Sequence, residues 1–125
     1  MSQPLRIVIV EDEAIVLMQL HLLLEDAGHH VVGTAMATEE ALDVLDTTCP
    51  ELVLLDLQLR DGASGLDIAR ALRHHEDLTM VFITANVRKL SEDLEGAAAV
   101  IAKPFNERAL EGSLAYLEEC LHRPP

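Results

Sequence analysis

Short, almost continuous runs of apolar residues alternate along the chain with longer segments in which apolar residues recur every three or four positions. Such runs are typical of strands buried on both faces of a parallel sheet, and the spacing of three or four is typical of helices. We expect strands at residues 5–10, 31–35, 52–55, 80–84 and 99–102. Strands that alternate with helices in this way predict a three-layer α/β domain with a central five-stranded parallel sheet.

The segments between these strands carry signals for the starts and ends of helices. A first helix is expected at about residues 13–27, with Gly28 as its C-cap. A second is expected at about residues 39–46, with Thr38 as its N-cap. A third begins at Ser64 with a sequence that resembles a capping box.

The last helix has a clear amphipathic pattern, whereas the fourth helix is short. Asn106 is the expected N-cap of the last helix, and Phe105 and Leu110 occupy the two positions of a hydrophobic staple. One stripe of this helix carries Leu110, Leu114, Leu117 and Leu121. The fourth helix must fit within residues 85–95, which allows about two turns at 3.6 residues per turn. Helices of that length are marginal on their own.

Composition and charge narrow the classes of partner. The 125-residue chain suits one domain, and its 22 acidic and nine basic residues give a formal net charge of −13. Binding to nucleic acids or to anionic membranes depends on Lys and Arg, so we expect neither, and a basic protein or divalent cations fit better. No signal peptide or membrane-length apolar run is apparent. With Cys49 and Cys120 far apart in the sequence, we expect free thiols and a cytoplasmic location.

The residues that end the predicted strands are the most informative, because open parallel α/β sheets bind ligands outside the carboxyl ends of their strands. The first strand ends in Glu11 and Asp12, the third in Asp56, the fourth in Thr84 and the fifth in Lys103. Each has an ordinary structural explanation: acids favour a helix N-terminus, Asp begins Asx-turns, Thr suits a strand and Lys is often solvated. A single site at this edge explains all of them together.

Three carboxylates at one point repel one another unless a cation lies among them. Hard oxygen ligands of this kind suit Mg²⁺. Asp56, on the central strand, is the acid best placed to act as a nucleophile, and a carboxylate can accept a phosphoryl group as an acyl phosphate. Phosphoryl transfer needs mainly positioning and neutralised charge, which the metal, Lys103 and the Thr84 hydroxyl can supply.

With these residues in place, the sequence resembles a response-regulator receiver domain over nearly its whole length. The matching segments read "IVIVEDE", "LVLLDLQLRDGASGLDIARAL", "VFITA" and "GAAAVIAKPF". The resemblance implies a (βα)5 flavodoxin-like, or CheY-like, fold with strand order 2-1-3-4-5. It also implies a single receiver domain over residues 5–122, and we expect no output domain in this chain.

The resemblance assigns roles by position. Asp56 is the implied phosphoacceptor, and Glu11, Asp12, Asp56 and the backbone carbonyl of Gln58 are the implied ligands of Mg²⁺ or Mn²⁺. Thr84 and Lys103 are the implied phosphoryl-binding and switch residues. Two further positions are assigned: Pro104, expected to follow a cis peptide bond, and Asn86, which together with Gln58 is a candidate for tuning phosphoryl hydrolysis.

Partners also follow from the resemblance. Receivers accept phosphoryl groups from a sensor histidine kinase or a histidine phosphotransfer protein. They catalyse their own phosphotransfer and dephosphorylation but are not otherwise enzymes. Their downstream protein partner typically binds the face built from the fourth helix, the fifth strand and the last helix, which rearranges on phosphorylation.

Three departures from the family pattern concern this signalling face and the adjoining loop. Val100 stands where the family usually has an aromatic residue whose rotamer reports the switch. Arg60 replaces a proline in the loop after the phosphoacceptor, and the fourth helix is about one turn shorter than is common. The coupling between Thr84 and an aromatic side chain is therefore not expected in its usual form.

Two alternatives stay open at this point. The first is a pseudo-receiver, an interaction module that takes no phosphoryl group. The second is a phosphohydrolase with an aspartyl nucleophile. Such an enzyme usually needs a second acid two residues after the nucleophile, where this chain has Gln58.

The short fourth helix generates a prediction about local stability. Because a two-turn helix has few hydrogen bonds to protect, we expect amide hydrogen exchange to be fastest between Asn86 and Glu95. Exchange followed by mass spectrometry on overlapping peptides measures this directly. Protection in these peptides equal to that of the predicted strands would contradict a marginal fourth helix.

Overall fold

Five parallel strands form one sheet in the order β2-β1-β3-β4-β5. The structure is a computed structural model that describes residues 4–57, 68, 70, 72, 77–85, 98–103 and 105–121. The strands are β1 (Arg6–Val10), β2 (His30–Ala35), β3 (Leu52–Asp56), β4 (Thr79–Thr84) and β5 (Ala99–Ala102). The predicted strands are confirmed to within one residue at each end, and so is the expected strand order.

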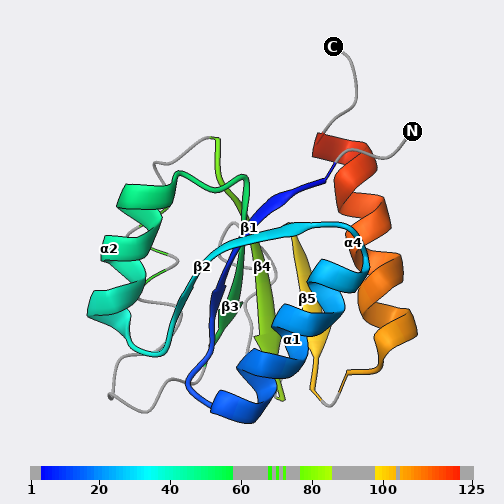
Figure 1. The fold of residues 1–125 in the computed structure, drawn as a ribbon, viewed down its shortest axis with the longest axis horizontal. Helices are drawn as coiled ribbons and strands as arrows, with labels where there is room; N and C mark the ends of the chain where they lie inside the picture. Colours follow the sequence, from blue (N-terminus) through cyan, green and yellow to red (C-terminus); the bar gives the residue numbers. More distant parts are fainter. Residues whose placement is uncertain are drawn as a thin grey trace.

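Helices cover both faces of this sheet, which makes the predicted three layers (Figure 1). Helices α1 (Ala14–Asp26) and α4 (Glu107–Leu121) lie on one face, and α2 (Thr38–Thr48) lies on the other. Ile68 and Arg70 are also helical, in line with a third helix. Its predicted start at Ser64, and residues 86–95 of the predicted fourth helix, lie outside the described residues.

Alternate residues of each strand build two separate hydrophobic cores. In β1, Ile7 and Ile9 pack with α1 and α4, whereas Val8 and Val10 pack with α2. The other inner strands alternate in the same way, and Phe82 of β4 is among the largest fully buried side chains. Burial on both faces explains why these strands are nearly continuous in apolar residues.

Helix α1 ends one residue earlier than predicted, because Ala27 is its C-cap and Gly28 follows it. Gly28 adopts a left-handed backbone with φ of +93°. Its N–H donates to the carbonyl of Glu25, and the N–H of His29 donates to the carbonyl of Leu24, both at 3.0 Å. These two bonds form a Schellman motif, which satisfies carbonyls left free at the helix end.

The prediction for the start of α2 was wrong by one residue. Thr38 is the first helical residue rather than the cap, and Ala37 occupies the N-cap position with no side-chain capping bond. Glu40 instead reaches back, and its carboxylate accepts a hydrogen bond from the N–H of Met36 at 3.0 Å. A glutamate in the first turn thus supports this helix start.

The start of α4 agrees with the prediction. The Asn106 side chain accepts a hydrogen bond from the N–H of Ala109 at 2.7 Å, which is N-cap geometry. Phe105 and Leu110 belong to the same core cluster, as expected of a hydrophobic staple. The predicted leucine stripe faces this core, with Leu110, Leu114 and Leu117 buried and Leu121 partly buried.

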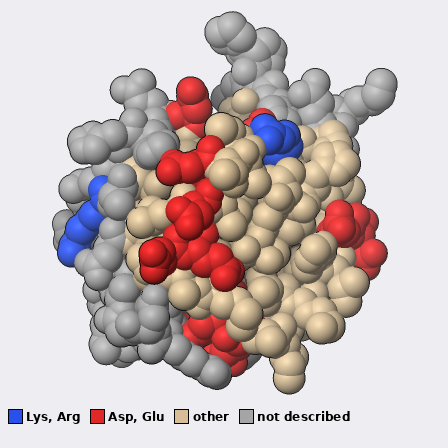
Figure 2. All heavy atoms as spheres, turned by 60° about the vertical axis from the view of Figure 1, so that its left-hand side comes forward, with Lys and Arg blue, Asp and Glu red and all other residues tan. Residues whose placement is uncertain are grey.

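The surface is strongly acidic over the outer side of α2. Figure 2 shows Asp and Glu side chains gathered on this side of the molecule, and α2 contributes the exposed Glu39, Glu40, Asp43 and Asp46. A polyanion meets repulsion at such a surface. Among the described residues, no helix has the length and apolar character needed to cross a bilayer.

The backbone of Gly28 generates a prediction about stability. An added Cβ at Gly28 meets open space, so Gly28→Ala costs only the strain of a positive φ, about 1 kcal/mol in the free energy of unfolding. Gly112, inside α4, also faces open space, so Gly112→Ala is the matched control and should stabilise by about 0.5–1 kcal/mol. Urea unfolding checks both signs, and destabilisation by both variants would contradict this account.

Candidate functional site

Three carboxylates converge at the carboxyl edge of the sheet. Glu11 and Asp12 follow β1 directly, and Asp56 is the last residue of the neighbouring β3. All three are buried, with Glu11 0% exposed. Each offers a carboxylate oxygen, and these oxygens lie within 4.8 Å of one another. The sequence prediction that these acids share one site agrees with this geometry.

Lys103 brings a cation to the same point. Its backbone N–H donates to the carbonyl of Thr84 at 2.8 Å, which fixes the chain just beyond the last pair of residues of β4 and β5. Its Nζ lies 3.1 Å and 3.2 Å from the two carboxylate oxygens of Glu11 and 3.4 Å from Oδ2 of Asp56. The ammonium therefore bridges two of the three acids, and the side chain is only 18% exposed.

The electrostatics of Glu11 reflect this crowding. Burial raises the pKa of Glu11 to about 7, helped by the charge of Asp56 and opposed by Lys103. Burial alone lowers the pKa of Lys103, but its hydrogen bond to Glu11 and the charges of Asp56 and Glu11 outweigh burial and raise that pKa. The pKa of Glu11 therefore lies well above that of an ordinary carboxyl group.

The donor set fits a hard divalent cation. Three buried carboxylates supply oxygen ligands from one small region, and carboxylates with water complete the coordination that Mg²⁺ prefers. Mn²⁺ accepts the same ligands. A bound cation would also offset the burial and the charge of Asp56, which together raise the pKa of Glu11. The backbone carbonyl of Gln58, the fourth expected ligand, lies outside the described residues.

Of the remaining predicted site residues, two are among the described residues and two are not. Thr84 is 2% exposed and ends β4, the strand next to Asp56 in the sheet. Val100, where the family usually has an aromatic residue, is partly buried and pairs with Phe82 of the neighbouring strand β4. An aromatic side chain is therefore present next to this position, but on β4 rather than on β5. Asn86 and Pro104 lie outside the described residues, so the expected cis peptide bond stays a prediction.

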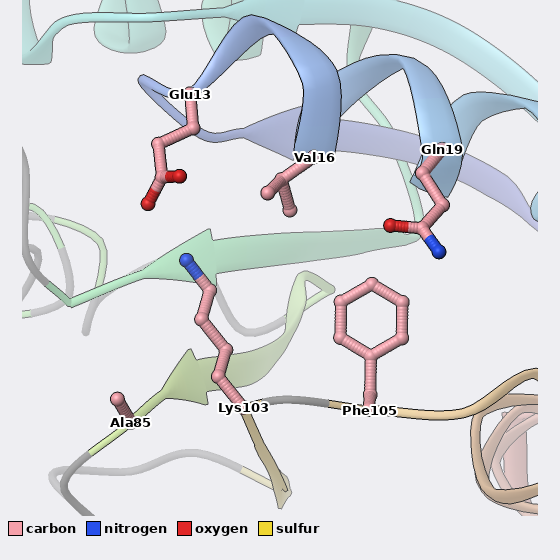
Figure 3. A pocket seen from close by; sticks show the side chains of 6 residues that line it. All are labelled: Glu13, Val16, Gln19, Ala85, Lys103 and Phe105. Carbon is pink, nitrogen blue, oxygen red and sulfur yellow. The ribbon is translucent and has the colours of Figure 1, made fainter.

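A pocket of about 370 Å³ opens beside Lys103, between the start of α1 and the segment that follows β5. In Figure 3, Glu13 and Lys103 point toward one another at one end of this pocket, and Gln19 and Phe105 lie at the other end. Its lining residues are Glu13, Val16, Gln19, Ala85, Lys103 and Phe105. Sequence reasoning missed this pocket because its walls come from three separate segments.

Helix α1 also exposes an apolar stripe. Ile15, Met18 and Leu22 are 83%, 64% and 60% exposed. Their spacing of three and four places them on one side of the helix, while Leu20 and Leu24 are buried on the other side. The sequence carried a signal for this stripe, because α1 has apolar residues on more sides than it needs to pack against one hydrophobic core.

A family model described as the response regulator receiver domain matches residues 7–115. The chain belongs to the response regulator receiver family. The phyllosphere-induced regulator PhyR of Methylorubrum extorquens is 40% identical over 101 residues, which cover 79% of this chain and 38% of PhyR. Response regulators such as PhyR are signalling proteins rather than conventional enzymes.

Solved structures agree with this membership. The solution structure of the Erythrobacter litoralis PhyR receiver domain matches with a TM-score of 0.84 and 31% identity, covering 98% of this chain and 95% of that one. The Bartonella quintana PhyR, described as an anti-anti-sigma factor, matches with a TM-score of 0.75 and 30% identity over 94% of this chain and 50% of that one. The chain thus spans half or less of the length of the M. extorquens and B. quintana PhyR proteins.

The contacts of Lys103 generate a prediction about stability. Lys103→Met keeps the length of the side chain but leaves Glu11 and Asp56 without this cation, so we expect a loss of about 1–3 kcal/mol at pH 8 in the absence of metal. Because the pKa of Glu11 is raised in the folded state, the stability that its protonated form contributes is lost as pH rises through about 7. At pH 5 Glu11 is protonated, so Lys103→Met leaves one fewer buried charge without a partner. The loss of stability caused by Lys103→Met should therefore be smaller at pH 5.

Thermal unfolding in EDTA at the two pH values measures this difference. Arg108→Met is the matched control, because Arg108 is an exposed basic residue in the first turn of α4. Equal losses for the two variants, or a larger Lys103→Met loss at pH 5, would contradict the role of Lys103.

Proposed function

We propose that Asp56 accepts a phosphoryl group from the phosphohistidine of a sensor histidine kinase or a histidine phosphotransfer protein, with Mg²⁺ or Mn²⁺ as cofactor. The observation that carries the proposal is the bridge made by Lys103 between Glu11 and Asp56. It places a cation 3.4 Å from the carboxylate that is to carry the phosphoryl group. Neutralised charge around a positioned nucleophile is what phosphoryl transfer requires.

The residues of the site have separate tasks in this reaction. A carboxylate oxygen of Asp56 attacks phosphorus, the P–N bond of the donor breaks, and its electron pair goes to the imidazole nitrogen. The ring, protonated on its other nitrogen in the donor, leaves as neutral imidazole. Glu11, Asp12 and Asp56 would hold the divalent cation, which supplies further neutralisation of phosphoryl charge. Lys103 pairs with a phosphoryl oxygen, and the hydroxyl of Thr84, at the end of the adjacent strand, donates to another.

The same contacts suggest how phosphorylation changes the protein. The acyl phosphate carries about −1.5 to −2 charges in place of the single charge of the Asp56 carboxylate, and this extra charge draws the ammonium of Lys103 away from Glu11. The backbone N–H of Lys103 donates a hydrogen bond to the carbonyl of Thr84. A displacement of either residue therefore also affects the ends of β4 and β5. A shift of this kind works on an existing equilibrium between two conformations, and each ~1.4 kcal/mol of preference changes it tenfold.

The apolar stripe of α1, formed by Ile15, Met18 and Leu22, suits the docking of the phosphodonor. It begins four residues after Glu11, so a protein lying on it stands next to Asp56. A spacing of three and four residues matches the apolar side of a helix in the partner. The chain's net charge of −13 favours basic residues around that side.

A second surface suits the downstream protein. Tyr116 of α4 is 66% exposed, and α4 adjoins the segment that leaves Lys103. We place the output on the face of β5 and α4 together with the predicted fourth helix. Contact with another protein is consistent with the anti-anti-sigma role named for the Bartonella quintana PhyR.

Phosphorylation of Asp56 is tested by intact mass after incubation with acetyl phosphate and Mg²⁺. We expect the protein to gain one phosphoryl group, and Asp56→Asn or addition of EDTA to abolish the gain, because each removes a required component. Asp46→Asn is the matched control, since Asp46 is exposed on α2 and should leave the gain unchanged.

Two outcomes would count against the proposal. A gain that persists in Asp56→Asn would mean that another residue is the acceptor. No gain in the unsubstituted protein, with acetyl phosphate or with a phosphorylated histidine phosphotransfer protein, would favour an interaction module that works without phosphorylation. Beryllofluoride, which mimics the phosphoryl group, then serves to capture the downstream protein if the gain is found.

A further inference from the structure

The pocket beside Lys103 contains a carboxylate that the proposed reaction does not use. Glu13 lies two residues after Glu11, and its side chain points into the pocket toward Lys103 (Figure 3). Its backbone is held in place, because its N–H donates to Oε1 of Glu11 at 3.3 Å. The Glu13 carboxylate is therefore a negative charge on the side of Lys103 that lines the pocket, and Lys103 in turn contacts Asp56.

We propose that Glu13 is a specificity-determining residue that favours phosphodonors with a nitrogen leaving group over donors with a carboxylate leaving group. The proposal rests on the proposed function, because it concerns the donor that phosphorylates Asp56. It adds a residue that acts on the leaving group rather than on the phosphoryl group.

The position of Lys103 explains why the charge of Glu13 is felt by a donor. Nζ of Lys103 already contacts Glu11 at 3.1 Å and Asp56 at 3.4 Å, so those two acids offset its charge. The Glu13 side chain points toward the same ammonium from the pocket (Figure 3). A donor that approaches Asp56 from the side of this pocket meets the carboxylate of Glu13 next to Lys103.

The two donor classes differ in the charge that departs. When Asp56 attacks a phosphoramidate or phosphoimidazole, the P–N bond breaks and its electron pair goes to that nitrogen. The donor already carries the needed proton, on the amine nitrogen of a phosphoramidate or on the other ring nitrogen of a phosphoimidazole, so a neutral amine or imidazole bearing an N–H leaves. When Asp56 attacks an acyl phosphate, the P–O bond breaks and a carboxylate anion leaves. Glu13 can accept a hydrogen bond from the departing N–H, whereas it repels the departing anion.

The remaining walls of the pocket fit the same donor class. Val16, Ala85 and Phe105 are apolar, and the pocket volume of about 370 Å³ accommodates a flat ring such as imidazole. Gln19 adds a neutral polar group at the far end, near Phe105. An apolar wall with an acidic acceptor suits a heteroaromatic N–H donor, while the ammonium of Lys103 in the same lining is taken up by the phosphoryl group.

The test compares the rates at which phosphoramidate and acetyl phosphate phosphorylate Asp56, at low ionic strength and with saturating Mg²⁺. Glu13→Gln keeps the shape of the side chain and removes its charge. We expect the ratio of the phosphoramidate rate to the acetyl phosphate rate to fall on the order of threefold, the size of effect for one charge a few ångströms away in water. The difference should shrink near 1 M salt, where the Debye length is about 3 Å.

Two further variants separate the pocket from overall charge. Gln19→Glu adds a carboxylate to the same pocket and should raise the ratio. Glu119→Gln removes one charge from an exposed position on α4, 12 residues beyond the first residue of that helix and so about 18 Å along it, and should leave the ratio unchanged.

The outcomes distinguish this proposal from the proposed function. If Asp56 is phosphorylated but Glu13→Gln leaves the ratio unchanged, or Glu119→Gln shifts it equally, the role of Glu13 is overturned and the phosphoacceptor assignment stands. If neither donor phosphorylates the unsubstituted protein, both proposals fail. A fall with Glu13→Gln together with a rise with Gln19→Glu supports the selection of leaving groups by this pocket.

Discussion

The burial of three carboxylates at one edge of a hydrophobic sheet is the constraint on which the rest of this structure depends. Buried like charges are costly, and a cation must lie among them or a proton must neutralise one of them. Lys103 contributes that cation from beyond β5, although Asp56 ends β3 and Glu11 follows β1, two strands on the far side of β4. The side chain that supplies this cation must reach across the end of β4, and only a long side chain can do so. With this strand order, the position therefore requires a residue as long as lysine.

Much of the fold and of the site could be predicted because both follow from strong, local patterns. Runs such as 52–55 must be strands buried on both faces, and the residues that end them must meet at one edge of a parallel sheet. Asp56 and Lys103 could therefore be paired across 47 residues of sequence before any geometry was known. The start of α2 was less predictable. Thr38 suits either the N-cap or the first helical position, and the hydrogen bond from Met36 to Glu40 that accompanies the earlier start is apparent only in the structure.

Other features could not be predicted for physical reasons. The pocket beside Lys103 depends on the relative position of α1 and the chain after β5, which no local pattern encodes. Likewise, periodicity does not distinguish an apolar side that faces the core from one that faces a partner. Leu20 and Leu22 look alike in the sequence, yet one is fully buried and the other is 60% exposed. Val100 illustrates a third limit, since its partner Phe82 becomes apparent only from the strand register.

The exposed apolar stripe of α1 has a consequence for the behaviour of the protein in solution. Large apolar side chains on a surface promote self-association, and this chain carries three of them on one helix. Its excess of acids supplies the opposing force, because copies that share a charge of −13 repel one another before their stripes can touch. The same two features therefore determine both solubility and recognition. The apolar stripe supplies a contact surface, and the surrounding negative charge favours partners that are positively charged.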